Sequence, residues 1–224
     1  LVSTDKAVNP TNVMGASKRV AEQVIQARSI DTNVKYMAVR FGNVIGSSGS
    51  VIPTFQEQIK NGGPLTITDP NIKRYFMSIP EAAQLILQAG SIGKGGEIFV
   101  LDMGEPVLIK DIAIELIKLS GFTADVDIPI EYIGLRPGEK MFEELITKGE
   151  NIIDSPHEKI MILKNQLKHG WNQTLAESEH IVNISKSYNT ELIKKTLNSV
   201  VPEYVPNTQK NDNLDILKKK NQRT

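Results

Sequence analysis

The sequence contains no cysteine, which excludes disulfide bonds and thiolate metal sites and fits a reducing compartment. Its three histidines, His157, His169 and His180, do not have the spacing of metal ligands, so we predict no metal site. Basic and acidic residues number 26 each, so no net charge indicates nucleic acid or a membrane surface as a partner. No apolar run approaches the roughly 20 residues of a membrane span, and no signal peptide is visible. We therefore expect these 224 residues to be soluble.

A Gly-x-Gly-x-x-Gly motif is also absent ahead of the first predicted strand, and the chain does not begin with Met. Gly93-Lys94-Gly95-Gly96 is a turn between a predicted helix and a predicted strand, which is the wrong context for a phosphate loop. A doubly wound sheet carries that loop on its first strands. We therefore expect the chain to be the C-terminal part of a longer enzyme.

The opening segment holds the residues on which the functional prediction depends. A short apolar start leads into Ser3-Thr4-Asp5-Lys6, and Asn9-Pro10 is predicted to open a helix. Met14 and Lys18 are four residues apart, so they share one face of that helix. If the face looks toward the strand end, these polar groups form one cluster. Consecutive strand residues point to opposite faces, so this requires the strand to end at about Thr4.

This segment, with Met14-Gly-Ala-Ser-Lys18 after the Ser-Thr-Asp-Lys run, resembles the active-site segment of extended short-chain dehydrogenase/reductases. Among them it resembles the nucleotide-sugar 4,6-dehydratases of the polysaccharide-biosynthesis (CapD-like) family. Met14 stands where the usual Tyr-x-x-x-Lys motif has Tyr, as in the large, membrane-anchored UDP-N-acetylglucosamine 4,6-dehydratases. The resemblance implies NAD or NADP as cofactor and a UDP-sugar as substrate. It also implies a dinucleotide-binding half and transmembrane helices upstream of Leu1.

The resemblance further implies a catalytic role for each polar residue. Lys6 is the base that removes the proton at C5 of the sugar, Asp5 is the acid for the departing 6-hydroxyl, and Thr4 hydrogen-bonds the 4-hydroxyl. Beyond these three roles, we assign Lys18 as the cation that holds the nicotinamide ribose. The Met14 thioether cannot take the 4-hydroxyl proton as a tyrosinate does. Either another group or a water takes it, or the protein is not an oxidising enzyme.

The segment from Gly42 to Ser50 follows a predicted strand at 35–41, at the carboxyl end where open α/β sheets bind ligands. The whole loop resembles that of the family. Its glycines permit close backbone approach, and Asn43 offers donors and acceptors to a diphosphate or a nicotinamide amide. We assign Asn43 and Val44 to cofactor binding, and Asn43 and Ser50 to substrate binding.

Two arginines are predicted to bind the nucleotide. Arg74 lies in an Asp-Pro-x-x-x-Arg-Tyr-Phe-Met motif that, by resemblance, contacts the nucleotide end together with Met77. Arg136 opens an Arg-Pro-Gly segment that resembles the second phosphate clamp of such enzymes, with Glu139 accepting from ribose hydroxyls. A planar guanidinium matches diphosphate oxygens in a bidentate manner, which lysine does less well.

The fold class expected is α/β, the C-terminal portion of a Rossmann-like doubly wound parallel sheet with a small α/β substrate-binding subdomain. Residues 1–60 would complete the NAD(P)-binding domain, residues 61–206 would form an interleaved substrate-binding region, and residues 207–224 would be a disordered tail. Apolar periodicity predicts helices at 51–59, 80–89, 109–119 and 190–200, and strands at 35–41, 65–68, 97–104 and 159–163. Residues 147–159 are predicted to form a loop over the site.

These observations favour a UDP-N-acetylglucosamine 4,6-dehydratase of cell-surface polysaccharide biosynthesis, inactive as this fragment alone. By resemblance it would be a homo-oligomer at the cytoplasmic face of the bacterial plasma membrane, held there only through an N-terminal region. An epimerase of the same superfamily is an alternative, although it would not need the Asp5–Lys6 acid/base pair. A non-catalytic nucleotide-sugar-binding module is another, which Met14 and the missing dinucleotide loop favour. The sequence does not show whether the cofactor is NAD or NADP.

Overall fold

The protein is described here from a computed structural model, which covers residues 1–30, 32–47, 49–147, 150–163 and 169–206. The predicted tail at 207–224 lies outside the described residues. Within them the chain forms two compact units, each described by itself. Unit 1 comprises Leu1–Gly42, Pro80–Met103 and Glu144–Pro206, and unit 2 comprises Asn43–Ile79 and Gly104–Glu143. The helices described in either unit are too short or too polar to cross a membrane.

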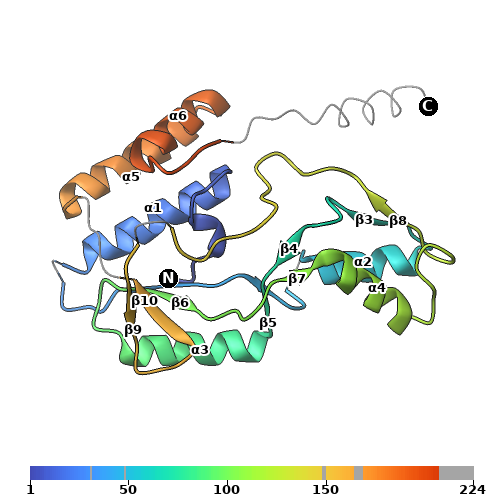
Figure 1. Cartoon of the computed structure of the whole chain (residues 1–224). Helices are drawn as coiled ribbons and strands as arrows, with labels where there is room; N and C mark the ends of the chain where they lie inside the picture. Colours follow the sequence, from blue (N-terminus) through green and yellow to red (C-terminus); the bar gives the residue numbers. More distant parts are fainter. Residues whose placement is uncertain (31, 48, 148–149, 164–168, 207–224) are drawn as a thin grey trace. The chain divides into compact units, whose positions relative to one another are not determined.

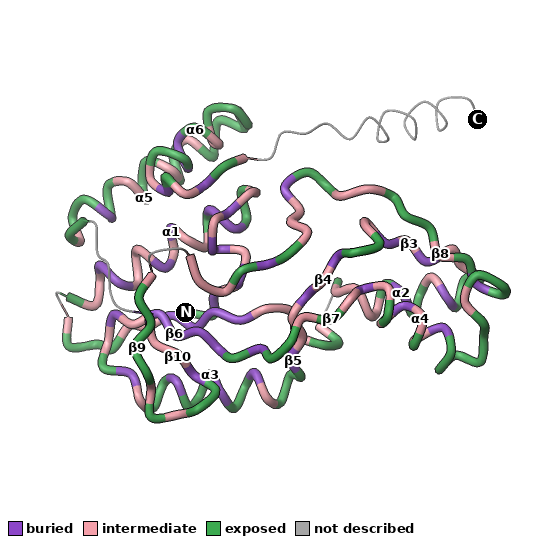
Figure 2. The backbone as a smooth tube through the Cα atoms, in the orientation of Figure 1, coloured by how far each residue is buried: buried purple, intermediate pink, exposed green. Residues whose placement is uncertain are grey.

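Unit 1 is built on a four-stranded sheet in the order β1-β6-β10-β9 (Figure 1). The strands are β1 (Ala38–Arg40), β6 (Ile98–Leu101), β9 (Ile152–Asp154) and β10 (Ile160–Leu163). β1 and β6 are parallel, whereas β10 is antiparallel to both β6 and β9. Buried residues run along β1 and β6, as a strand covered on both faces requires (Figure 2).

The helices of unit 1 lie on both sides of these strands, with α1 on one side and α3 on the other (Figure 1). This arrangement confirms the predicted α/β class. The helical elements are η1 (Asp5–Ala7, a 3-10 turn), α1 (Val13–Arg28), α3 (Ile79–Ile92), α5 (Trp171–Ser185) and α6 (Thr190–Val200). Helices α5 and α6 both pack on α1. An apolar cluster joins α1 to α6 and the residues after it, and Ile181 of α5 packs against this cluster, which consists of Ala16, Val20, Leu197, Val201 and Tyr204.

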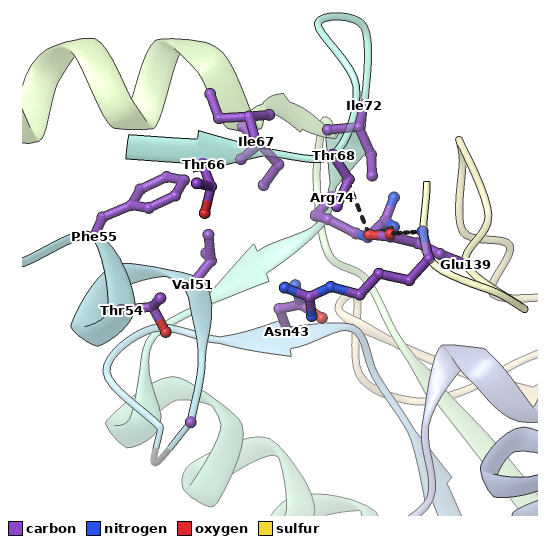
Figure 3. Close-up of a pocket in the computed structure, with 13 residues that line it drawn as sticks. Asn43, Val51, Thr54, Phe55, Thr66, Ile67, Thr68, Ile72, Arg74 and Glu139 are labelled. Atoms are coloured by element: carbon purple, nitrogen blue, oxygen red, sulfur yellow. Dashed lines mark hydrogen bonds and ion pairs between the residues drawn. The ribbon is translucent and has the colours of Figure 1, made fainter. Parts of the chain in front are cut away.

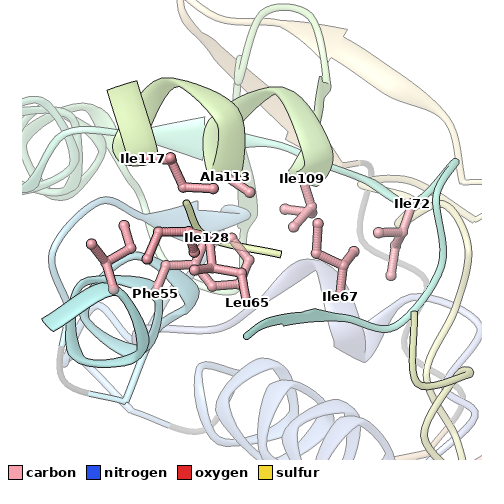
Figure 4. Packing of buried hydrophobic residues seen from close by; sticks show 9 residues of the cluster. Phe55, Leu65, Ile67, Ile72, Ile109, Ala113, Ile117 and Ile128 are labelled. Carbon is pink, nitrogen blue, oxygen red and sulfur yellow. The ribbon is translucent and has the colours of Figure 1, made fainter. Parts of the chain in front are cut away.

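Unit 2 consists of two helices and three short strand pairs. Parallel pairs are formed by β2 (Asn43–Val44) with β5 (Phe76–Met77) and by β3 (Leu65–Ile67) with β8 (Ile130–Tyr132), and an antiparallel pair by β4 (Lys73–Arg74) with β7 (Val107–Leu108). Helices α2 (Val51–Lys60) and α4 (Ile109–Leu119) pack on them. The core that holds these elements together is apolar (Figure 4) and consists of Phe55, Ile59, Leu65, Ile67, Ile72, Ile109, Ala113, Ile117 and Ile128.

Two local predictions need correction, and one helix was missed. Helix α1 begins at Val13 rather than at Asn9-Pro10, because Asn12 is the residue whose side chain accepts from the Gly15 N–H at 2.8 Å. Asn9 instead adopts a positive φ of 39°. Residues 152–154 of the predicted loop form β9, paired with β10. Helix α5 was not predicted at all, since its sequence has few apolar residues in a helical pattern.

Candidate active site

The chain turns at the end of its first extended segment, where the catalytic residues were predicted. Thr4 is extended, with φ −153° and ψ 154°, and the 3-10 turn η1 begins at the next residue, Asp5. The condition that the sequence set, an end to the extended backbone at about Thr4, is therefore met. Asp5 and Lys6 leave the alternating pattern of a strand and can face the same side.

Within this turn, a hydroxyl and an amine both donate to one carboxylate oxygen. Thr4 Oγ1 donates to Asp5 Oδ1 at 2.8 Å, and Lys6 Nζ donates to the same oxygen at 3.0 Å. We call Thr4, Asp5 and Lys6 the acid/base cluster. The structure thus brings together the three residues to which the sequence assigned acid, base and hydrogen-bonding roles.

The three members differ in exposure. The Asp5 side chain is fully buried and its Oδ2 atom has no hydrogen-bond partner, while the Lys6 side chain keeps 27% of its surface accessible. Thr4 is half-buried. Lys6 and Thr4 are therefore the groups that a ligand meets first, and Asp5 contacts one only if its side chain rotates. The role of Asp5 as acid stays a prediction.

Helix α1 approaches the acid/base cluster closely at Gly15. A Cβ atom at this position would overlap the Lys6 carbonyl oxygen, so the lack of a side chain is what allows the approach. One turn further along, Lys18 Nζ donates to the Val2 carbonyl at 3.2 Å, beside the start of the cluster. Met14 is 48% exposed. The helix face predicted to carry Met14 and Lys18 therefore begins against η1.

Sequence reasoning missed a buried charged network behind the acid/base cluster. Glu22 of α1 and Arg40 of β1 are both fully buried and are joined by Arg40 Nε and Nη2, each 2.8 Å from a Glu22 oxygen. Glu22 also accepts from Ser3 Oγ at 2.6 Å and from Arg19 at 3.0 Å. The sequence does place Glu22 and Arg40 within otherwise apolar patterns, which indicates that they are buried. It does not show that they bind each other.

The network extends to two later segments of unit 1. Glu150 accepts from Arg40 at 2.9 and 3.1 Å, and Glu203 accepts from Arg19 at 2.9 Å. Burial alone would raise the pKa of Glu22, but the hydrogen bonds and charge of Arg40, aided by Arg19 and Ser3, hold that pKa below its ordinary value. Burial alone would lower the pKa of Arg40, but the hydrogen bonds and charges of Glu22 and Glu150 have the larger effect and raise that pKa. Both groups are therefore charged at neutral pH.

Unit 2 contains a separate cavity of about 170 Å³ among the residues predicted to bind the nucleotide (Figure 3). Four of the six predicted substrate-binding residues line it, namely Asn43, Arg74, Arg136 and Glu139. Ser50 is not among the lining residues, but Gly49 and Val51 on either side of it are. The Ser50 hydroxyl is buried without a hydrogen-bond partner at the N-terminus of α2. Met77 is buried in β5, next to Val44 in the pairing of β5 with β2.

The two predicted clamp arginines differ in what they bind. Arg74 donates to the backbone carbonyls of Lys73, Lys140 and Met141, at 2.8 to 3.1 Å, and to Glu139 at 3.3 Å. Arg136 is exposed, and its backbone N–H is held by Glu139 Oε2 at 3.0 Å. Arg74 thus fixes the conformation of residues 139–141. Of the two arginines that line the cavity, Arg136 is the one whose side chain is more exposed.

Comparison with known proteins gives a consistent grouping. The sequence profile of a family described as "Polysaccharide biosynthesis protein" matches residues 1–165. The capsular polysaccharide biosynthesis protein CapD of Staphylococcus aureus is 58% identical over 161 residues, which are 71% of this chain and 27% of CapD. The probable polysaccharide biosynthesis protein EpsC of Bacillus subtilis is 57% identical over 164 residues, 73% of this chain and 27% of EpsC. The chain thus spans about a quarter of the length of these relatives.

More distant similarities include enzymes of two kinds. A UDP-glucose 4-epimerase of Rickettsia canadensis is 40% identical over 156 residues, which are 67% of this chain and 43% of that protein. Among solved structures, Pen from Bacillus thuringiensis matches with a TM-score of 0.67 and 38% identity, over 74% of this chain and 52% of Pen. The dTDP-glucose 4,6-dehydratase DesIV of Streptomyces venezuelae matches with a TM-score of 0.57 over 65% of this chain and 50% of its own, and at 20% identity shows the fold alone.

Proposed function

We propose, from the premise that the chain belongs to the polysaccharide biosynthesis protein family, that it is the catalytic and substrate-binding part of a UDP-N-acetylglucosamine 4,6-dehydratase. The observation that carries the proposal is the acid/base cluster, in which Thr4 and Lys6 converge on one oxygen of Asp5. Removing water across C5 and C6 of a sugar requires a base and an acid within reach of adjacent carbons. A surface lysine without such neighbours would not meet that requirement.

In the proposed reaction each residue of the cluster has one task. Lys6 takes the C5 proton. Asp5, after its buried side chain has rotated toward the sugar, donates a proton to the 6-hydroxyl, which leaves as water while the C5–C6 double bond forms. Thr4 hydrogen-bonds the oxygen on C4. Bound NAD(P)⁺ would supply the acceptor for the C4 hydride and later its donor to C6. The C4 hydroxyl proton passes to water, because Met14 cannot accept it, and Lys6 returns its proton to C5 when the hydride goes back to C6. Asp5 regains a proton from solvent, so the sugar has lost one water and the cofactor ends as it began.

Lys18 is proposed to hold the cofactor, because its ammonium keeps donors for a ligand. An ammonium has three donors, and Lys18 uses one of them on the Val2 carbonyl. Lys18 is half-buried, so it can bind the hydroxyls of a nicotinamide ribose. Asn43 and Val44, at the strand end in unit 2, are proposed as further contacts. Either NAD or NADP satisfies these groups.

The nucleotide would bind in the cavity of unit 2. The exposed guanidinium of Arg136 suits a diphosphate, and the buried Ser50 hydroxyl at the N-terminus of α2 suits a phosphate oxygen. Glu139 is proposed to bind a ribose hydroxyl. Arg74 and Met77 are proposed to shape the site around the nucleotide, since Arg74 already binds three backbone carbonyls.

For the whole protein we propose a homo-oligomer that acts at the cytoplasmic face of the bacterial plasma membrane, in the production of a cell-surface polysaccharide. The names of the CapD and EpsC relatives support the pathway. A nucleotide-sugar 4-epimerase is the second candidate, favoured by the similarity to the Rickettsia enzyme. Epimerisation moves a hydride at C4 without an elimination, so it gives no task to the Asp5–Lys6 pair.

The test is to incubate the full-length gene product with NAD(P)⁺ and UDP-N-acetylglucosamine and to follow the sugar nucleotide by mass spectrometry and NMR. A dehydratase removes one water, an epimerase leaves the mass unchanged but inverts C4, and a binding module changes neither. Lys6→Ala is expected to lower turnover by about 10²-fold or more, as for loss of a general base. Lys118→Ala, an exposed lysine at the end of α4, is the control. Full turnover by Lys6→Ala would remove the base assignment.

A further inference from the structure

Glu22 is held more firmly than any residue of the acid/base cluster. Its two oxygens accept four hydrogen bonds, from Ser3 Oγ at 2.6 Å, Arg40 at 2.8 Å twice, and Arg19 at 3.0 Å. The carboxylate is fully buried, so water does not compete for these donors. A carboxylate with this many hydrogen bonds has a fixed orientation. It therefore also fixes the position of a side chain that donates to it.

The residue that it orients is Ser3, which immediately precedes the acid/base cluster. The backbone N–H of Ser3 donates to Val39 at 2.8 Å, and that of Asp5 donates to Phe41 at 3.1 Å. Arg40, the last residue of β1, lies between Val39 and Phe41 in the chain, and its side chain holds Glu22. The turn is therefore held by β1 twice, directly through the main chain and indirectly through Arg40, Glu22 and Ser3.

We propose that Glu22 is a positioning residue, which acts through the Ser3 hydroxyl to set the direction in which η1 presents Lys6 and Thr4. Nothing in the mechanism proposed above uses Ser3, Glu22 or Arg40. This inference rests on the proposed function for its catalytic consequence, although the link itself is a property of the turn. Its weakest member is the single Ser3–Glu22 hydrogen bond, because the ion pair between Glu22 and Arg40 persists without it.

The experiment removes only that bond, by Ser3→Ala in the full-length gene product. The first measurement is hydrogen–deuterium exchange of the peptide that contains Thr4 to Val8, without ligand. The amides of Ala7 and Val8 are bonded within the turn, to Thr4 and Asp5, so they report its opening. We expect about tenfold faster exchange there in Ser3→Ala. Ser91→Ala, which loses a hydroxyl bonded to Gln88 in its own helix α3, is expected to leave this peptide unchanged.

The second measurement is steady-state turnover of UDP-N-acetylglucosamine. A misdirected Lys6 lowers kcat, by about 10-fold to 100-fold for a displacement of the order of 1 Å, while KM stays the same because the nucleotide contacts are intact. A purely structural role would lower Tm and leave kcat below Tm unchanged. Faster exchange with unchanged kcat would therefore overturn the proposal, as would exchange equal to wild type.

The two proposals fail in different ways. If the wild-type protein removes no water from the substrate, the proposed function fails, and the exchange measurement still decides whether Ser3 and Glu22 hold the turn. If the wild-type protein is a dehydratase and Ser3→Ala matches it in both measurements, only the positioning role fails. Glu203→Gln is a second control, because Glu203 contacts Arg19 at the edge of the network and not Ser3.

Discussion

Each unit buries an arginine, and the two arginines bind different groups. Arg40 of unit 1 is fully buried and its guanidinium is bonded to the carboxylates of Glu22 and Glu150. Arg74 of unit 2 is nearly as buried, but most of its hydrogen bonds go to backbone carbonyls. Arg40 therefore joins a helix to a strand by charge, whereas Arg74 fixes the conformation of one loop. Neither guanidinium is presented to a ligand as openly as that of Arg136.

The comparison teaches how to separate scaffold from site in this chain. A buried charge whose partners are all protein groups maintains the fold, and removing one partner leaves the other uncompensated. A polar group on a cavity wall with unused donors is instead available to a ligand. By this criterion Arg40 and Arg74 hold the fold, although Arg74 was predicted to bind the nucleotide, and Arg136 is the exposed group on the cavity wall that a ligand can reach.

The largest effect is expected from Glu22→Ala. It takes from the buried Arg40, and from the partly buried Arg19, the buried carboxylate that both of them bind. Breaking a buried ion pair in this way costs about 3 to 5 kcal/mol in the free energy of unfolding. Urea denaturation monitored by circular dichroism measures the change. A loss of less than about 1 kcal/mol, which is typical of an exposed pair, would show that the network is not the scaffold described here.

The next effect contrasts Arg136 with Arg74. Arg136→Ala should weaken UDP binding by about 10-fold to 100-fold, because hydrogen bonds to a charged group contribute roughly 1.5 to 3 kcal/mol. Its Tm should be unchanged, since the side chain is exposed. Arg74→Ala should lower Tm as well as affinity, because three backbone carbonyls lose their donor. Isothermal titration calorimetry with UDP measures the affinity, and thermal unfolding measures Tm. A lower Tm for Arg136→Ala together with an unchanged Tm for Arg74→Ala would contradict the roles given to the two arginines.

Two glycines in helices give a matched pair of smaller effects. Replacing a helical glycine by alanine normally stabilises a protein by about 0.5 to 1 kcal/mol, and Gly90→Ala in α3 should do so because open space surrounds the site. Gly15→Ala should instead destabilise by about 1 to 3 kcal/mol, because its Cβ would overlap the Lys6 carbonyl. Parallel thermal melts test this pair. Equal shifts would mean that α1 does not press on the turn.

Local signals were enough for much of this structure. The helices predicted at 109–119 and 190–200 have those bounds in α4 and α6, and α2 differs from its prediction by one residue. The contact of Thr4 and Lys6 with Asp5 was also predictable, because the three residues are adjacent in sequence and the extended segment ends at Thr4; their catalytic roles stay predictions.

What could not be predicted depends on residues far apart in the chain. Glu22 and Arg40 are ordinary charged residues in isolation, and only the packing of α1 against β1 makes them a buried pair. Asn9 was a reasonable cap, but its side chain is bonded to Glu144 at 2.7 Å, and Asn12 caps the helix instead. Helix α5 has a weak local pattern, and Trp171 at its start lies 4.9 Å from the Arg28 guanidinium of α1. Long-range contacts decided each of these cases.

The buried network should also make stability depend on acid pH. The pKa of Glu22 in the folded protein lies below its ordinary value of about 4.5, so on acidification the unfolded chain binds this proton first. The stabilisation is complete at a pH above the ordinary pKa of about 4.5, and it is lost as the pH falls through the lower pKa that Glu22 has in the folded protein. In Glu22→Gln the fall in unfolding free energy below about pH 4.5 should be shallower than in wild type. Urea titrations at a series of pH values from neutral downward measure it, and parallel curves would contradict it.

The smallest effect is expected for an ion pair that resembles the buried one only in its distance. Lys159 Nζ lies 2.9 Å from Glu81 Oε1, and the hydrogen bond and charge of Glu81 raise the pKa of Lys159. Both side chains are exposed, however, so water and salt screen the attraction. Lys159→Ala should therefore leave the urea midpoint at neutral pH within error, with Lys118→Ala as the matched exposed lysine. If Lys159→Ala clearly lowers the urea midpoint at low salt but not at 1 M salt, this exposed ion pair does stabilise the fold. The exposure of a charged pair would then be a poor guide to its contribution in this chain.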